Sequence, residues 1–185
     1  MELRFKLLEH PFYQSWTKGE ITIPQLSIYA AAYTEFIDCV PHLWQRVTDN
    51  LGVNGAEAKA IIAEEKEHVN LWRLWSDKLP QAESNPGMKD IVDGFEKMTD
   101  SELAGAIHAF EIQQPEVAKT KKEGLINFYG FSEADAKYFD EHMNEAEHIV
   151  FGNRIYREAS DKEEFERGFD KGAELVYKGL DRFLS

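Results

Sequence analysis

Cysteine is almost absent from this sequence, which contains one, Cys39, among 185 residues. A single thiol cannot form an intrachain disulfide framework, and it cannot supply a zinc site built from several cysteines. This cysteine usage suits a reducing compartment, so we expect a cytoplasmic protein. The length is enough for one domain, residues 1–185, to bury a core of its own.

Long hydrophobic runs and excess positive charge are also missing. No stretch reaches the roughly 18 apolar residues of a membrane span, and the first ten residues mix charged and apolar side chains, unlike a signal peptide. With 21 Lys and Arg against 34 Asp and Glu, the net charge is −13. This balance disfavours nucleic acids and anionic membranes as partners and favours small or cationic ligands.

Residues that favour β-strands are scarce. Val, Ile and Thr together number 26, whereas Ala, Glu and Lys number 54, and this difference predicts an all-α fold. The helical pattern predicts about seven helices, over residues 3–18, 24–50, 56–79, 87–98, 101–129, 132–158 and 160–184.

Capping residues and prolines mark several of these helix boundaries. Thr22, Thr99 and Ser160 each precede a segment of helical length and have the character of N-caps. Pro41 and Pro115 lie inside periodic runs, where proline is expected to kink a helix.

Two predicted helices carry a Glu-x-x-His pair on an apolar face. In the third, Glu65 and His68 share the stripe of apolar residues at 3,4 spacing, and in the sixth Glu145 and His148 do the same. Positions three apart differ by about 60° around a helix, so each pair can direct two ligands to one place.

Two further acids, Glu35 and Glu111, occupy positions where an apolar residue is expected. A buried carboxylate is disfavoured unless it is paired, protonated or bound to a metal. Single Glu residues on two helices and Glu-x-x-His on two others are the ligand set of carboxylate-bridged di-iron and di-manganese bundles. The alternative is that these acids belong to exposed clusters, because a chain with 23 Glu and six His produces such pairs by chance.

Four blocks of the sequence resemble a known family. They are EHPFYQSWTKGEITIPQLSIYAAAYTEFIDCVP (9–41), EEKEHVNLW (64–72), FEIQQPEVAKTKKEGLINFYGF (110–131) and YFDEHMNEAEH (138–148). In this order they are similar to the death-domain-associating redox proteins, a family that includes self-sacrificing para-aminobenzoate synthases. That family belongs to the haem-oxygenase-like group, together with the pyrroloquinoline-quinone synthases and type II thiaminases.

The resemblance implies a haem-oxygenase-like bundle of about seven helices that binds two metal ions, iron and/or manganese, instead of haem. The family's ligands are three carboxylates and three histidines. Four of them match His68, Glu111, Glu145 and His148. Glu145 stands where the family has aspartate, which is a conservative change.

Two ligand positions stay open. The family motif points to Glu64, whereas the apolar stripe favours Glu65. In the last block, the spacing from His142 to the next acid is one residue shorter than in the family. Either His142 reaches the metal through an irregularity in the helix, or Glu141 replaces it.

Tyr13 and Lys121 match the tyrosine that the para-aminobenzoate synthases consume for its aromatic ring and the lysine implicated as their nitrogen donor. Without the resemblance, a core tyrosine and a solvated lysine would be the ordinary interpretation. Phe110 stands where the family has a tyrosine, which removes a hydroxyl near the metals.

The resemblance and the buried acids together lead us to expect an oxidase that activates dioxygen at two metal ions. The expected ligands are Glu65, His68, Glu111, His142, Glu145 and His148. The substrate is either Tyr13 itself or a small organic molecule. The alternatives are a cofactor-free or thiaminase-like enzyme on the same fold, or a non-enzymatic protein-interaction module. Dimers are common in this fold group, so a homodimer is one expected assembly.

Overall fold

Helices account for all the regular structure in residues 1–144 and 146–184, the part of the chain that this computed structural model describes. The prediction of an all-α fold is confirmed. The 3₁₀ helices η1 and η2 and the α-helices α1 to α9 follow in the order η1 (Leu7–Glu9), α1 (Pro11–Thr17), α2 (Ile23–Asn50), α3 (Ala56–Ser76), α4 (Lys89–Glu96), α5 (Asp100–Glu111), α6 (Gln114–Phe128), α7 (Lys137–Met143), α8 (Ala146–Glu158), α9 (Lys162–Gly179) and η2 (Leu180–Phe183). Within the described ranges, we find no helix long and apolar enough to span a bilayer.

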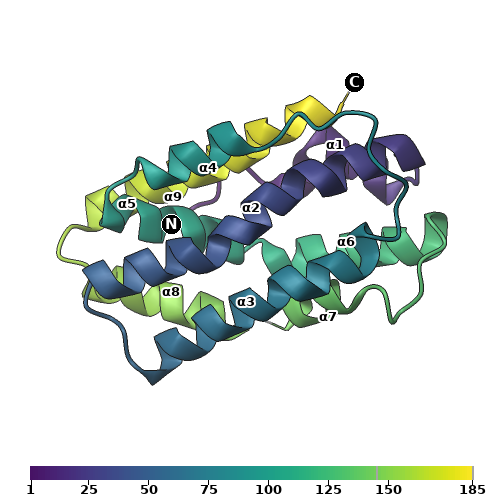
Figure 1. The fold of residues 1–185 in the computed structure, drawn as a ribbon. Coiled ribbons are helices and arrows are strands. Elements are labelled where there is room, and N and C mark those ends of the chain that lie inside the picture. Colours follow the sequence, from purple (N-terminus) through teal and green to yellow (C-terminus); the bar gives the residue numbers. More distant parts are fainter. Residues whose placement is uncertain (145, 185) are drawn as a thin grey trace.

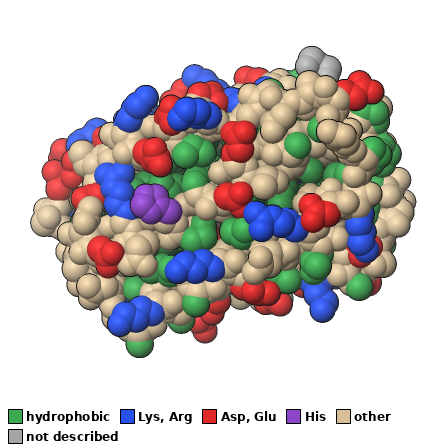
Figure 2. Space-filling model, viewed as in Figure 1, with side chains coloured by type: hydrophobic (Ala, Val, Ile, Leu, Met, Phe, Trp, Pro, Cys, Tyr) green, Lys and Arg blue, Asp and Glu red, His purple; other side chains and the backbone are tan. Residues whose placement is uncertain are grey.

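The two longest helices, α2 and α3, lie side by side and antiparallel (Figure 1). Behind them, α5 packs against α9 and α8, while α6 packs against α7 and the short α1. Acidic and basic side chains are interspersed over the face that Figure 2 shows. The apolar faces of the helices meet in a core rich in buried Trp, Tyr and Phe side chains.

Two of the predicted N-caps are confirmed. The side chains of Thr22 and Thr99 accept the backbone N–H groups of Gln25 and Glu102, each in a reciprocal capping box. The prediction for Ser160 was wrong, because α9 is capped by its neighbour Asp161.

Helix breaks account for the difference between seven predicted helices and the nine α-helices of the described residues. The segment 101–129 divides after Glu111, because the ring of Pro115 clashes with the carbonyl four residues earlier and starts a new helix instead of kinking one. By contrast, α2 continues through Pro41. The segment 132–158 divides after Met143.

The first predicted helix, 3–18, is also shorter than expected. Its α-helical part begins at Pro11 and is only seven residues long. Pro11 suits the first turn of a helix because it lacks an N–H group that would have no partner there.

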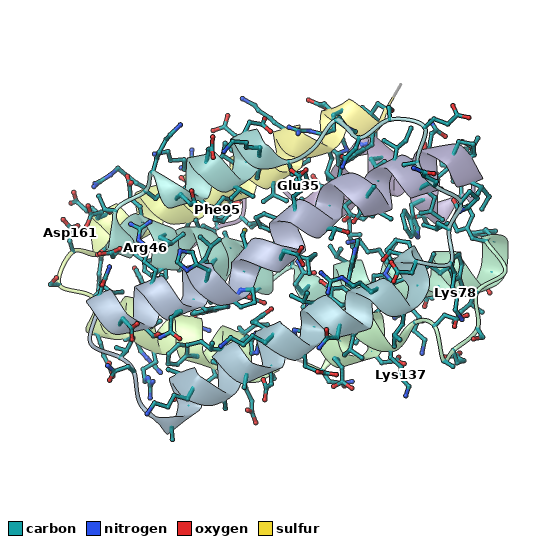
Figure 3. The ribbon with its side chains drawn as sticks, in the orientation of Figure 1. Glu35, Arg46, Lys78, Phe95, Lys137 and Asp161 are labelled. Atoms are coloured by element: carbon teal, nitrogen blue, oxygen red, sulfur yellow. The ribbon has the colours of Figure 1, made fainter. Side chains whose placement is uncertain are left out.

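Arg46 of α2 ties that helix to the turn between α4 and α5 (Figure 3). Its guanidinium donates to the carboxylate of Asp100 at 2.8 Å and to the carbonyls of Glu96 and Met98 at 2.8 and 2.6 Å. These bonds fix the start of α5, the helix that carries Glu111.

Glycines allow α5 and α9 to cross at very short range. A Cβ atom on Gly105 would lie 2.0 Å from the carbonyl oxygen of Phe165, and one on Gly168 would lie 1.9 Å from that of Glu102. Both obstacles are backbone atoms, which cannot rotate out of the way. The contact therefore depends on the absence of side chains.

Replacing Gly168 by alanine should lower the free energy of unfolding by roughly 1–3 kcal/mol or more, because the added methyl group forces the two backbones apart. Gly94→Ala in α4 is the matched control, since its Cβ meets only the end of the Leu175 side chain, at 2.9 Å. That change gains up to about 1 kcal/mol of helix propensity. Chemical denaturation measures both, and equal midpoints would contradict the close crossing.

Candidate metal centre

Helix α3 brings one acid and one histidine into the core. Glu65 is 4% exposed and His68 is 5% exposed, and both lie on the face that also buries Ile61 and Trp72. The Nδ1 atom of His68 is 3.4 Å from Oε2 of Glu65. The prediction that this pair lies on the buried stripe of its helix is confirmed.

Glu111 enters the same region from the last turn of α5. Its carboxylate is 2% exposed and accepts a hydrogen bond of 3.2 Å from the indole N–H of Trp44 on α2. Burial and the nearby charge of Glu65 raise the pKa of Glu111. An acid in this position is costly unless a cation offsets its charge.

Helices α7 and α8 each supply one histidine. His142 is buried near the end of α7, and its Nδ1 lies 2.8 Å from the carbonyl oxygen of Tyr138. His148 is buried in the first turns of α8. Glu145, the other predicted ligand of this segment, lies outside the described residues.

His148 lies among three carboxylates. Its Nε2 is 3.1 Å from Oε2 of Glu64, and its Nδ1 is 3.2 Å from Oε1 of Glu65 and 3.7 Å from Oε2 of Glu111. Within the described ranges, this buried Nδ1 atom has no partner with hydrogen-bond geometry. An imidazole nitrogen placed between two carboxylates in this way fits a position where a cation is bound.

The donors form two groups that share one residue. Glu65, His68 and His142 make one group, and Glu65, Glu111 and His148 make the other, with the ligand atoms of each group within 4.8 Å of one another. All five side chains are buried. Their carboxylate and imidazole donors suit iron or manganese, and Glu65 is placed to serve two ions.

Electrostatics favour the protonation states that two of these ligands, Glu65 and His142, need to bind a metal ion. Burial alone would raise the pKa of Glu65, but the neighbouring His148 and His68 lower it to about 2. Burial, together with the nearby His68, lowers the pKa of His142 to about 3. Burial also disfavours the charged form of His148, but Glu111 and Glu65 raise its pKa to about 12. A metal ion at this position would have to displace that proton.

The two alternative ligands, Glu64 and Glu141, differ in their position relative to the donor groups. The side chain of Glu64 is 49% exposed but still touches His148, whereas Glu141 is exposed on the outer side of α7. The helix breaks after Met143, and His142 on α7 is buried whereas Glu141 is exposed.

Glu35 was wrongly expected in the core. It lies on the exposed side of α2, where its carboxylate accepts the backbone N–H of Met88 at 2.8 Å, just ahead of α4 (Figure 3). His108, three residues before Glu111, belongs to neither donor group in the described part of the chain. It packs between Phe165 and Phe169, and burial lowers its pKa to about 4.

Tyr13 and Lys121 meet in a second buried cluster of side chains, which we call the tyrosine pocket. Tyr13 lies on α1 and is 1% exposed, and Lys121 lies on α6 and is 2% exposed. The lysine Nζ is 5.5 Å from the centre of the Tyr13 ring. The rings of Tyr33 and Tyr29 complete this side of the pocket, at 4.8 and 5.4 Å from Nζ.

Burial alone lowers the pKa of Lys121 to about 7. The aromatic faces around Nζ partly compensate the lost hydration of an ammonium group, but they leave a large fraction of the amine neutral at neutral pH. Burial also raises the pKa of the Tyr13 phenol. The pocket therefore holds a phenol beside an amine that is available as a nucleophile.

Aromatic contacts join this pocket to the donor groups. Ring centres are 5.6 Å apart for Tyr33 and Trp72, 5.0 Å for Trp72 and Tyr138, and 4.0 Å for Tyr138 and His142. Trp72 follows His68 by one helical turn, so the sequence alone indicates that the two residues share one face of the helix.

Comparison with known proteins finds relatives of this chain, although no family model matches it. The chain is 31% identical over 199 residues to the 4-aminobenzoate synthase of Chlamydia muridarum, covering 96% of this chain and 84% of that protein. It is 32% identical over 164 residues to the 4-aminobenzoate synthase of Nitrosomonas europaea, covering 74% and 67% respectively. A third relative, the 4-aminobenzoate synthase of Chlamydia trachomatis, is 29% identical over 199 residues. The chain belongs to the 4-aminobenzoate synthase family.

Proposed function

We propose that this protein is a metal-dependent enzyme with a haem-oxygenase-like fold that makes 4-aminobenzoate from its own Tyr13, with Lys121 as the nitrogen donor. The observation that carries the proposal is the buried Lys121 amine, 5.5 Å from the centre of the Tyr13 ring. Both groups are buried side chains of the chain itself, so the proposed reaction needs no separate aromatic substrate. The names of the relatives support the same product.

The proposed reaction balances with one dioxygen. The bond between Cα and Cβ of Tyr13 breaks, Cβ becomes a carboxyl carbon that holds both oxygen atoms, and one hydrogen of Cβ passes to Cα. These changes amount to a four-electron oxidation, which one dioxygen can accept. Exchange of the phenol oxygen for the Lys121 nitrogen is redox-neutral and leaves a hydroxyl group on the lysine side chain.

The side chains of the metal centre and those around Tyr13 have different roles in the proposed reaction. Glu65, His68, Glu111, His142 and His148 would hold two ions, and iron or manganese would supply the activation of dioxygen when bound. Lys121 supplies a neutral amine. The surrounding rings keep water away from Tyr13 and hold the amine against it.

Metal content should depend on which acid is removed. We expect about two iron or manganese ions per chain in the reconstituted protein. Glu65→Gln should lose both, because Glu65 belongs to both donor groups, whereas Glu111→Gln should retain about one.

Elemental analysis of freshly reconstituted protein measures the content. Glu35→Gln is the control, since this exposed acid contacts α4 and should leave the metal content unchanged. A wild-type protein that binds neither metal would contradict the proposal and favour a cofactor-free enzyme.

Tyr13→Phe should abolish the formation of 4-aminobenzoate, because the phenol oxygen that the amine replaces is missing. The wild type, given metal, reductant and dioxygen, should yield at most about one product per chain, with mass changes at both Tyr13 and Lys121. Intact-protein and peptide mass spectrometry locate these changes. Tyr156→Phe, which removes a hydroxyl bonded to Glu166 at the surface, should behave as the wild type. Several products per unmodified chain would instead indicate a diffusible substrate.

The rate of product formation should rise with pH through about 7, the pKa of Lys121. Below that value the amine is protonated and cannot donate its electron pair, so each pH unit should cost up to about tenfold in rate. Lys121→Arg, which stays charged, should yield no 4-aminobenzoate. Lys122→Arg, next to it but paired with Glu133 and Asp140, is the control. Equal rates at pH 6 and 8 would contradict a titrating amine.

A further inference from the structure

The helix that carries Tyr13 depends on its neighbours for its position. Helix α1 has seven residues, and a helix of this length has little stability of its own in water. Its start is held by His10, whose Nδ1 accepts the N–H of Phe12 and whose Nε2 lies 3.1 Å from Oδ1 of Asp181. These contacts fix one end of α1 but do not touch Lys121.

Trp16 makes the contact that reaches Lys121. This fully buried residue follows Tyr13 by three positions, and its indole N–H donates to the backbone carbonyl of Lys121 at 3.3 Å. The bond therefore links the helix that carries the phenol to the residue that carries the amine.

Gly124 provides the space for the indole. It lies one turn after Lys121 on α6, and a Cβ atom at this position would lie 2.3 Å from Nε1 and 2.6 Å from Cδ1 of Trp16. Any side chain there would push the indole away from the Lys121 carbonyl. The position of the indole beside the Lys121 carbonyl thus requires a glycine at position 124.

We propose that Trp16 and Gly124 are a positioning pair that holds the Tyr13 ring in register with the Lys121 amine, that is, at the distance and orientation that the amination needs. The pair thereby directs the reaction to amination. This inference rests on the proposed function. Neither residue supplies an atom to the product. Their effect is on geometry, and a displacement of about 1 Å between reacting groups can cost about a hundredfold in rate.

Loss of register has a specific chemical consequence. If Tyr13 is cleaved by one dioxygen while its phenol oxygen stays in place, the released acid is 4-hydroxybenzoate and Lys121 is unchanged. This outcome uses the same four-electron balance as before and omits only the redox-neutral exchange of oxygen for nitrogen. The ratio of 4-hydroxybenzoate to 4-aminobenzoate therefore reports the register.

Trp16→Phe is the first test, since it removes the indole N–H and keeps an aromatic ring. We expect the ratio of 4-hydroxybenzoate to 4-aminobenzoate to rise at least about tenfold, with metal content unchanged. Trp75→Phe is the matched control. Trp75 is equally buried, and its Nε1 has no hydrogen-bond partner in the described residues, so the wild-type ratio should persist.

Two further variants separate register from stability. Gly124→Ala displaces the indole from the other side and should raise the same ratio. Replacement of Trp16 by benzothienylalanine keeps the ring shape and removes only the N–H, so it serves if the other variants fold poorly. A structural role alone would lower both products in parallel.

An unchanged ratio in the Trp16 and Gly124 variants, in protein whose wild type makes 4-aminobenzoate, would overturn the positioning role alone. A wild type that releases no aromatic acid from Tyr13 would overturn the proposed function, and the positioning role with it. The two failures are therefore distinguishable.

Discussion

The arrangement of the interior depends on carboxylates and imidazoles that are buried close together. Glu65 and Glu111 are both buried, and His148 lies between them. Two acids in such a place repel each other and lose their hydration, so they persist only with compensating positive charge. The fold supplies part of it through histidine and leaves positions where metal ions would supply the rest.

Lys121 presents the opposite case. Its amine is buried among aromatic rings, and this burial lowers its pKa. The core thus contains two environments for titratable groups. The charged forms of Glu65 and His148 are favoured in one, and the neutral amine of Lys121 is favoured in the other. Trp72 and Tyr138 lie between them, so the two regions are separated by aromatic rings.

Helical periodicity was sufficient to identify much of the donor set from the sequence. Glu65, His68 and Glu111 lie on buried stripes because their helices bury one face, and three residues make nearly one turn. The same argument failed for Glu35, because α2 contacts neighbours on several sides and position 35 turns toward the start of α4. Helical periodicity shows which residues share a face of a helix, but not which other element that face contacts.

Helical periodicity could not predict two features of the structure. One is the break between α7 and α8, and the other is the contact of Tyr13 with Lys121. No glycine or proline lies in residues 138–148, so a continuous helix was the natural prediction for that segment. The Tyr13 and Lys121 side chains lie more than a hundred positions apart and meet only through tertiary packing. Their selection from the sequence came from resemblance to a family, and nothing in their local context marked them.

The short helix α1 is built apart from the elements that carry the described metal donors, which come from α3, α5, α7 and α8. Undocking of those seven residues would open the tyrosine pocket to solvent while the donor groups stayed assembled. Under the proposed function, the enclosed aromatic acid would leave by that route, and the metal donors would not have to move. Release of the product and retention of the metal ions would then be independent of each other.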